Sequence, residues 1–257
     1  MVPVLLLSAA ALAWSGVSNL LLGDEGYLLR NLGLTVVLLL GAHLAGWRAG
    51  ELGLARAHLR RGAMVGLVAA GVVAAVVALG VVLADQVPLI GALLADERAA
   101  ASSDRLLYEA VLRIPLGTAF YEEVLFRGVL FAAWVRAVGR RGPGGYAAGR
   151  RAAVGYAARK RAAGRYAAGE RAAMIGSSVV FGLWHVAPTA VALEVNGVAV
   201  GSPMGVLGII GGVVVTTIAG LLFAWLRRVS GSLVAPILAH TATNVAGLLA
   251  AATVMSG

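Results

Sequence analysis

The sequence contains no cysteine, which excludes disulfide bonds, a thiolate nucleophile and a cysteine-ligated zinc site. It is also poor in charge, because only 13% of its 257 residues are charged, whereas a soluble domain has about a quarter. The first apolar segment lacks the basic start of a secretory signal, so we expect a retained span. With 60% hydrophobic residues, the chain is predicted to be an all-α, polytopic transmembrane helical bundle that forms a single membrane domain, 1–257.

Seven apolar segments are each close to the roughly 17–25 residues that a membrane-spanning helix needs. They are 3–22, 31–47, 62–84, 114–135, 174–192, 204–226 and 233–252. Loops rich in arginine and lysine alternate with acidic or weakly charged loops. The positive-inside rule therefore places the N-terminus and the basic loops in the cytoplasm and the C-terminus outside. We expect a multi-pass protein of the cell membrane, and the composition, rich in alanine, glycine and arginine, favours the cytoplasmic membrane of a bacterium.

The most basic loop, 139–173, contains three copies of a ten-residue repeat, GYAAGRRAAV, GYAARKRAAG and RYAAGERAAM. Residues 139–171 hold nine arginine or lysine side chains and one glutamate, so nearly all of the formal net charge of +9 lies there. We interpret the repeat as a solvated linker whose basic side chains attract the anionic headgroups of the lipid bilayer. The charge is a signal of topology, and no nucleic-acid partner is expected.

Several polar residues lie deep inside the predicted spans, where ionisable groups usually face the bundle interior or a wet cavity. They are Glu122, Glu123, Arg127, His185, His240 and Asn244. Glu123 and Arg127 are four residues apart on one helix face and are predicted to pair. Glu122 is rotated by about 100° from Glu123 and is left free for chemistry. The predicted depths place Glu122 in the same membrane layer as the two histidines and the asparagine.

This set of side chains can activate a water molecule and stabilise an oxyanion. Glu122 would be the general base, His185 would hold the water, and His240 and Asn244 would donate hydrogen bonds to the oxyanion. Alternatively, Glu122, His185 and His240 would bind zinc or another divalent metal that activates the water. The spacing of the residues leaves both mechanisms open.

Other intramembrane hydrolase patterns are absent from the sequence. There is no H-E-x-x-H motif of a zinc protease. No aspartate lies inside a predicted span, which argues against an aspartyl pair. Ser177 and Ser178 do not lie in the G-x-S-x-G pattern of a serine nucleophile.

The polar residues and their flanks resemble the three ordered motifs of the CPBP family, the CAAX-protease and bacteriocin-processing (ABI) intramembrane endopeptidases. The stretches that carry the resemblance are EEVLFRGVLF, SSVVFGLWHVAP and GSLVAPILAHTATNV, within about 120–250. The resemblance implies a catalytic core, 114–252, with an intramembrane catalytic cavity, and hydrolysis of a peptide bond in a membrane-associated or lipidated protein or peptide. It also implies that Glu122 is the catalytic glutamate and that the other five polar residues fill the remaining motif positions. The repeat-containing basic loop between the first two motifs departs from the family pattern.

Two other functions fit parts of the sequence. A family member without proteolytic activity would act as a membrane scaffold or immunity protein, but the intact set of six polar residues argues against it. A transporter or proton relay would show inverted repeats and broken helices in matching halves, and no such pairing is found.

Overall fold

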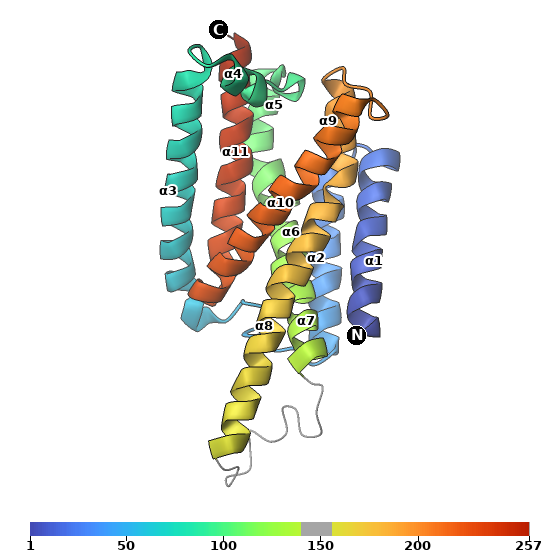
Figure 1. Cartoon of the computed structure of the whole chain (residues 1–257), viewed down its shortest axis with the longest axis vertical. Helices are drawn as coiled ribbons and strands as arrows, with labels where there is room; N and C mark the ends of the chain where they lie inside the picture. The colour runs from blue at the N-terminus through green and yellow to red at the C-terminus, as the bar shows by residue number, and fades with distance from the viewer. Residues whose placement is uncertain (140–155, 257) are drawn as a thin grey trace.

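Helices make up all the regular structure in the described part of the chain. The computed structural model describes residues 1–139 and 156–256, without the side chains of 156–163. Within these ranges there is no strand. Most of the long helices run along the longest axis of the molecule, and α10 (Pro203–Ser230) crosses them at an angle (Figure 1). The predicted all-α bundle is therefore confirmed.

Six helical segments in the described residues are long and apolar enough to cross a membrane, and each overlaps a predicted span. They are α1 (Val2–Gly16) with the π-helical turn η1 (Val17–Leu21), α2 (Tyr27–Leu44), α3 (Leu59–Ala84), α8 (Tyr156–Trp184) with α9 (Val186–Val195), α10, and α11 (Val234–Ser256). The outward faces are apolar: on α3, for example, Leu67 and Val68 are largely exposed. Such surfaces suit a lipid environment, and the chain is a multi-pass membrane protein.

The seventh predicted span, 114–135, lies within a series of short helical segments. These are α5 (Ser103–Tyr108), η4 (Glu109–Phe120), α6 (Tyr121–Glu123), η5 (Val124–Leu130) and α7 (Phe131–Gly139), of which η4 and η5 are π-helical. Pro115 lies within η4 and has no backbone N–H to donate, which favours a departure from α geometry. Because each segment is short, six helices among the described residues, instead of the predicted seven, are long and apolar enough to cross a membrane. The whole stretch 121–132 is buried, so this series forms the core of the bundle.

The basic segment 139–173 was predicted to be a loop, but its second part is helical. Helix α8 begins at Tyr156 and runs to Trp184, so residues 156–173 are helical and extend the predicted span 174–192. Alanine and arginine are among the strongest helix formers, and the repeat is rich in both. The rest of the predicted loop, 140–155, lies outside the described residues.

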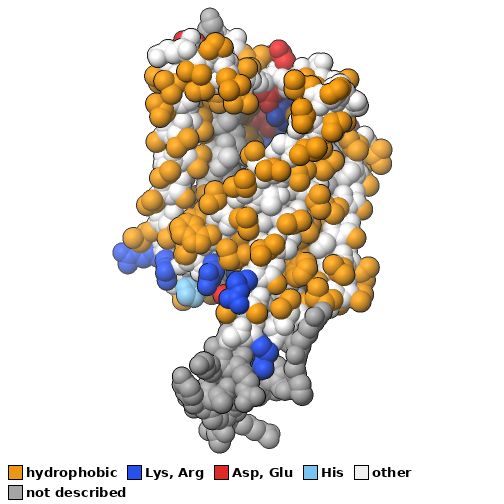
Figure 2. Space-filling view, viewed as in Figure 1, with side chains coloured by type: hydrophobic (Ala, Val, Ile, Leu, Met, Phe, Trp, Pro, Cys, Tyr) orange, Lys and Arg blue, Asp and Glu red, His pale blue; other side chains and the backbone are white. Residues whose placement is uncertain are grey.

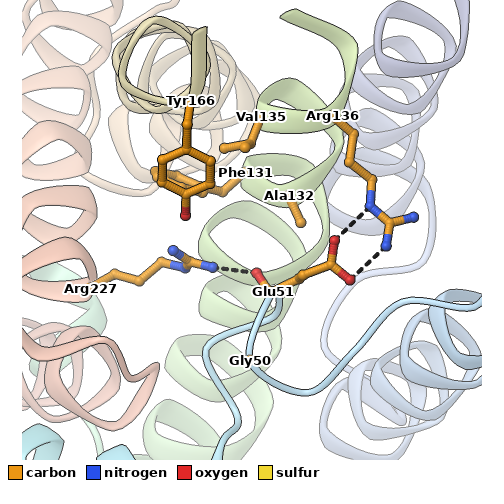
Figure 3. Close-up of a pocket in the computed structure, with 8 residues that line it drawn as sticks. All are labelled: Gly50, Glu51, Phe131, Ala132, Val135, Arg136, Tyr166 and Arg227. Carbon is orange, nitrogen blue, oxygen red and sulfur yellow. Dashed lines mark hydrogen bonds and ion pairs between the residues drawn. The ribbon is translucent and has the colours of Figure 1, made fainter. Parts of the chain in front are cut away.

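The basic and acidic loops lie at opposite ends of the bundle, as their alternation along the sequence predicted. At the basic end, Arg136 makes two hydrogen bonds to the carboxylate of Glu51, at 2.9 and 2.6 Å. Arg227 donates to the backbone carbonyl of Glu51 at 2.5 Å (Figure 3). Basic side chains gather at this end, below the apolar flank of the bundle (Figure 2). At the other end, Asp24 pairs with Arg113 at 2.6 Å. The two chain termini also lie at opposite ends (Figure 1).

Short helices connect the long ones at both ends: η2 (Arg56–His58) at the basic end, and α4 (Pro88–Leu94) and η3 (Glu97–Ala99) at the acidic end. The Asp96 carboxylate caps η3 by accepting a hydrogen bond from the backbone N–H of Arg98. Burial would raise the pKa of Asp96, but hydrogen bonds from Arg98 and Asn196 outweigh it and hold the pKa below its usual value. This end of the molecule is therefore fixed by charge-assisted contacts.

Candidate active site

The predicted site residues lie where the central helical series meets α8, α10 and α11. Three rings from different elements enclose this region: Phe126 from η5, Phe181 from α8 and Phe223 from α10, all of them buried. Glu122 is 4% exposed, and Glu123 and Arg127 are 0% exposed. Charges in such surroundings are costly unless they are paired. Each polar contact in this cluster therefore constrains the side chains strongly.

Glu123 and Arg127 form the ion pair that their spacing predicted. Arg127 Nη1 donates to Glu123 Oε1 at 2.8 Å. The guanidinium lies 4.0 Å from the ring centre of Phe181 and 5.2 Å from that of Phe223, so two aromatic faces hold it in place. The pair is a rigid support on one side of the cluster.

His240 of α11 connects the two glutamates. Its Nδ1 lies 2.9 Å from Glu123 Oε1, and because a carboxylate only accepts, Nδ1 carries the proton and donates. Its Nε2 lies 3.8 Å from Glu122 Oε2, which is too long for a hydrogen bond. The imidazole stacks on Phe223 with a centroid distance of 4.9 Å and an interplanar angle of 20°. The orientation of His240 is thus fixed from two sides.

Glu122 is held by a residue that sequence reasoning missed. The indole N–H of Trp184 donates to Glu122 Oε1 at 3.2 Å. In the described part of the chain, Glu122 Oε2 has no hydrogen-bond partner. A tryptophan in an apolar stretch is usually a packing residue, so nothing in the sequence around Trp184 indicated a hydrogen bond to Glu122.

His185 and Asn244 are less tightly connected to the cluster. His185 is half-buried, and its Nδ1 donates to the backbone carbonyl of Phe181 at 2.7 Å, which leaves Nε2 as an acceptor in the neutral ring. Its ring also packs edge-on against Phe181 at 4.5 Å. Asn244 is half-buried and follows His240 by one turn of α11, but within the described residues no hydrogen bond joins its amide to another group. The structure thus joins Glu123, Arg127 and His240 by hydrogen bonds, and it brings Glu122 to 3.8 Å from His240. His185 lies against the shared Phe181 ring.

The predicted metal set of Glu122, His185 and His240 fits a metal ion only in part. Both histidines have Nδ1 engaged and Nε2 open, which is the arrangement found in metal-ligating histidines. However, over residues 1–139 and 156–256 no group of three His, Asp or Glu side chains converges closely enough to hold a metal ion. The residues as placed do not form a metal centre.

Two cavities lie apart from this cluster, towards the basic end. The smaller one, of about 50 Å³, lies among Glu51, Phe131, Tyr166 and Arg227 (Figure 3). The larger is an apolar groove of about 690 Å³ between α1, α2 and the segments η5 and α7, with one charged residue, Arg136, in its lining.

The fold and this cluster together define a multi-pass membrane protein with a buried cluster of glutamate, arginine and histidine side chains in its core. A family model described as type II CAAX prenyl endopeptidase Rce1-like matches residues 105–246, which include all six predicted site residues. The chain belongs to this family of CAAX-type intramembrane proteases. A search of curated proteins and a search of solved structures found no match.

Proposed function

We propose that the protein is an intramembrane endopeptidase that hydrolyses a peptide bond of a membrane-associated or lipidated protein or peptide. The observation that carries the proposal is the free oxygen of Glu122. Glu122 Oε2 is buried, has no hydrogen-bond partner among the described residues and lies 3.8 Å from His240 Nε2. A free carboxylate oxygen next to an oriented imidazole suits general acid–base chemistry.

The gap between Glu122 Oε2 and His240 Nε2 suits one water molecule. A water that bridges two atoms 3.8 Å apart can make hydrogen bonds of about 2.8 Å to each. Glu122 takes a proton from this water while the oxygen attacks the carbonyl carbon of the peptide bond, which converts the carbonyl oxygen to an oxyanion. When the bond breaks, the leaving nitrogen receives the proton from Glu122.

The other site residues support this reaction. When His240 carries a proton on both nitrogens, Nε2–H faces the site and donates to the oxyanion, with the Asn244 amide as a second donor. His185 Nε2 accepts one hydrogen bond from the attacking water and Glu122 Oε2 accepts the other, while Nε2–H of the doubly protonated His240 donates to the water oxygen until the oxyanion forms. Glu123 fixes His240 through Nδ1, and Arg127 in turn fixes Glu123. Glu123 and Arg127 therefore act on the geometry and take no proton in the reaction.

The apolar groove supports a substrate with a hydrocarbon anchor. Its lining residue Val129 follows Glu122 by seven residues in the same helical series, which is a separation of about 10 Å along the helix. We assign the groove to the lipid part of a substrate, whose scissile bond then lies close to the anchor. A peptide without an anchor is expected to be a poor substrate.

Cleavage by matched glutamate variants tests the proposal. Lipid-anchored and unanchored peptide libraries are incubated with the protein in liposomes. Glu122→Gln is expected to lose activity by roughly 10²–10⁴-fold, the usual contribution of general base catalysis. The control is Glu109→Gln, because Glu109 is also buried but pairs with Arg105 and Arg113 outside the site.

Wild-type protein that cuts nothing beyond what Glu122→Gln cuts would leave the scaffold or immunity function as the better explanation. Equal cleavage of anchored and unanchored peptides would contradict the role of the groove. The same assay after chelation, with zinc added back, distinguishes a protein-only mechanism from a metal-assisted one.

A further inference from the structure

The hydrogen bond from Trp184 divides the two oxygens of Glu122 between different tasks. We propose that Trp184 is a positioning residue, whose indole N–H holds Glu122 Oε1 so that Oε2 is the oxygen that faces His240 and takes the proton. The inference rests on the proposed function and concerns how its general base is oriented.

Trp184 is the one hydrogen-bond donor to the Glu122 carboxylate among the described residues. The indole N–H lies 3.2 Å from Oε1, while Oε2 lies 3.8 Å from His240 Nε2 and makes no hydrogen bond. A glutamate has three rotatable side-chain bonds, and without this contact the carboxylate can rotate so that neither of its equivalent oxygens faces the histidine. The indole N–H removes that freedom, because it can only donate and it is aimed at one oxygen.

The indole is itself held by rings and by its backbone. It packs edge-on against Phe126 at 5.5 Å and tilted against Tyr121 at 6.0 Å. The carbonyl of Trp184 cannot accept a helical hydrogen bond from residue 188, because that residue is Pro188 and has no N–H. Ser15 of α1 fills this position, and its hydroxyl donates to the carbonyl at 2.6 Å.

This support comes from a part of the chain that the family match does not cover. Ser15 is 2% exposed and lies in α1, whereas the match begins at residue 105. Trp184 ends α8, and His185 follows it directly, so one contact with α1 fixes the junction that presents both residues to the site. The N-terminal helix thereby contributes to the orientation of Glu122 without touching it.

The first test compares two tryptophan variants by kinetics on the best-cleaved anchored peptide. Trp184→Phe keeps an aromatic ring and removes the donor. We expect kcat to fall about tenfold with KM within twofold of wild type, because the N–H acts on the base and not on the substrate. Trp134→Phe is the control, since the indole N–H of Trp134 is buried without a hydrogen-bond partner in the described residues. Its kinetic constants are expected to stay within twofold of wild type.

The second test does not depend on activity or on the folding of Trp184→Phe. Protein labelled with ¹⁵N-tryptophan gives one indole N–H resonance for each of its five tryptophans. Glu122→Gln keeps the side-chain size and removes the charge, so the Trp184 resonance is expected to move upfield while that of Trp134 stays in place.

The two hypotheses fail in different ways. A moved Trp184 resonance in a protein without Glu122-dependent cleavage overturns the proposed function and leaves the contact intact. An unmoved resonance, or wild-type kcat in Trp184→Phe, overturns the positioning role while cleavage by the wild type still supports the protease.

Discussion

Gly220 of α10 lies against the charged cluster at a position where an added side chain would press on its neighbours. A Cβ atom there would lie 3.1 Å from Arg127 Nη2 and 3.1 Å from both Cα and Cβ of Ser178. Arg127 has little freedom to retreat, because Glu123 holds it at 2.8 Å and the Phe181 ring lies 4.0 Å away. A displacement of the guanidinium would pass to Glu123, and from there to His240.

Substitution of two glycines in α10 isolates this effect. Gly220→Ala is expected to lower cleavage at least tenfold, because the chain of contacts from Arg127 to His240 shifts. Gly211→Ala is the control, since a Cβ there meets nothing within 4 Å. Both changes raise helix propensity, by about 1 kcal/mol, so thermal unfolding in detergent should show no loss of stability for Gly211→Ala. Wild-type activity in Gly220→Ala would show that the site tolerates movement of Arg127.

The sequence predicted local contacts in the site and missed the long-range ones. The ion pair of Glu123 and Arg127 followed from i,i+4 spacing, which fixes a shared helix face whatever the rest of the fold does. The bond between His240 and Glu123 joins residues 117 positions apart, and no periodicity encodes it. Trp184 was missed for another reason, because its own indole N–H is the donor and a tryptophan in an apolar stretch is normally a packing residue.

At the scale of helices, hydropathy located the membrane spans. It did not predict where a helix continues beyond its apolar part, or where a span consists of several short helical segments. The α8 helix starts well before its apolar part, since the basic repeat is made of helix formers and needs no membrane to be helical. The series from Ser103 to Gly139 is divided by π-helical segments. Such segments depend on local hydrogen bonding and packing, which an average of hydropathy over a window does not report. The all-α class and the order of the spans were nevertheless predictable from apolar length alone.

The packing of α3 on α11 gives a prediction at this scale. A Cβ at Gly66 of α3 would lie 2.9 Å from Ala235 Cα, a backbone atom that moves only if the two helices separate. We expect Gly66→Ala to cost about 1–3 kcal/mol, the usual range for overpacking. It should also lower activity, because α11 carries His240 five residues after Ala235.

Gly71 on the same helix provides the control for this prediction, because a Cβ there meets nothing within 4 Å. Gly71→Ala should unfold at the wild-type temperature or above it, since alanine has the higher helix propensity. Thermal unfolding in detergent separates the two variants. Equal unfolding temperatures for both would mean that the contact between α3 and α11 is less close than the structure shows.

For the molecule as a whole, charge is sorted between the two ends of the bundle. The arginines at the basic end belong to segments that are far apart in sequence, yet the contacts of Arg136 at the end of α7 and Arg227 at the end of α10 with Glu51 bring three of these segments together. The apolar groove lies at the same end, with Met1 and Trp47 in its lining. The orientation of the protein therefore decides which leaflet supplies a lipid-anchored substrate.

The absence of cysteine makes this orientation directly measurable, because each introduced thiol is the one thiol of the chain. Ala57→Cys lies in the exposed short helix η2 at the basic end, and Ala100→Cys lies in an exposed loop at the acidic end. By the positive-inside rule, a membrane-impermeant maleimide should label Ala100→Cys in intact bacterial cells and Ala57→Cys only after permeabilisation. That result places the groove at the cytoplasmic leaflet. The reverse pattern would place it at the outer leaflet, and equal labelling in intact cells would contradict the separation of the two ends by the membrane.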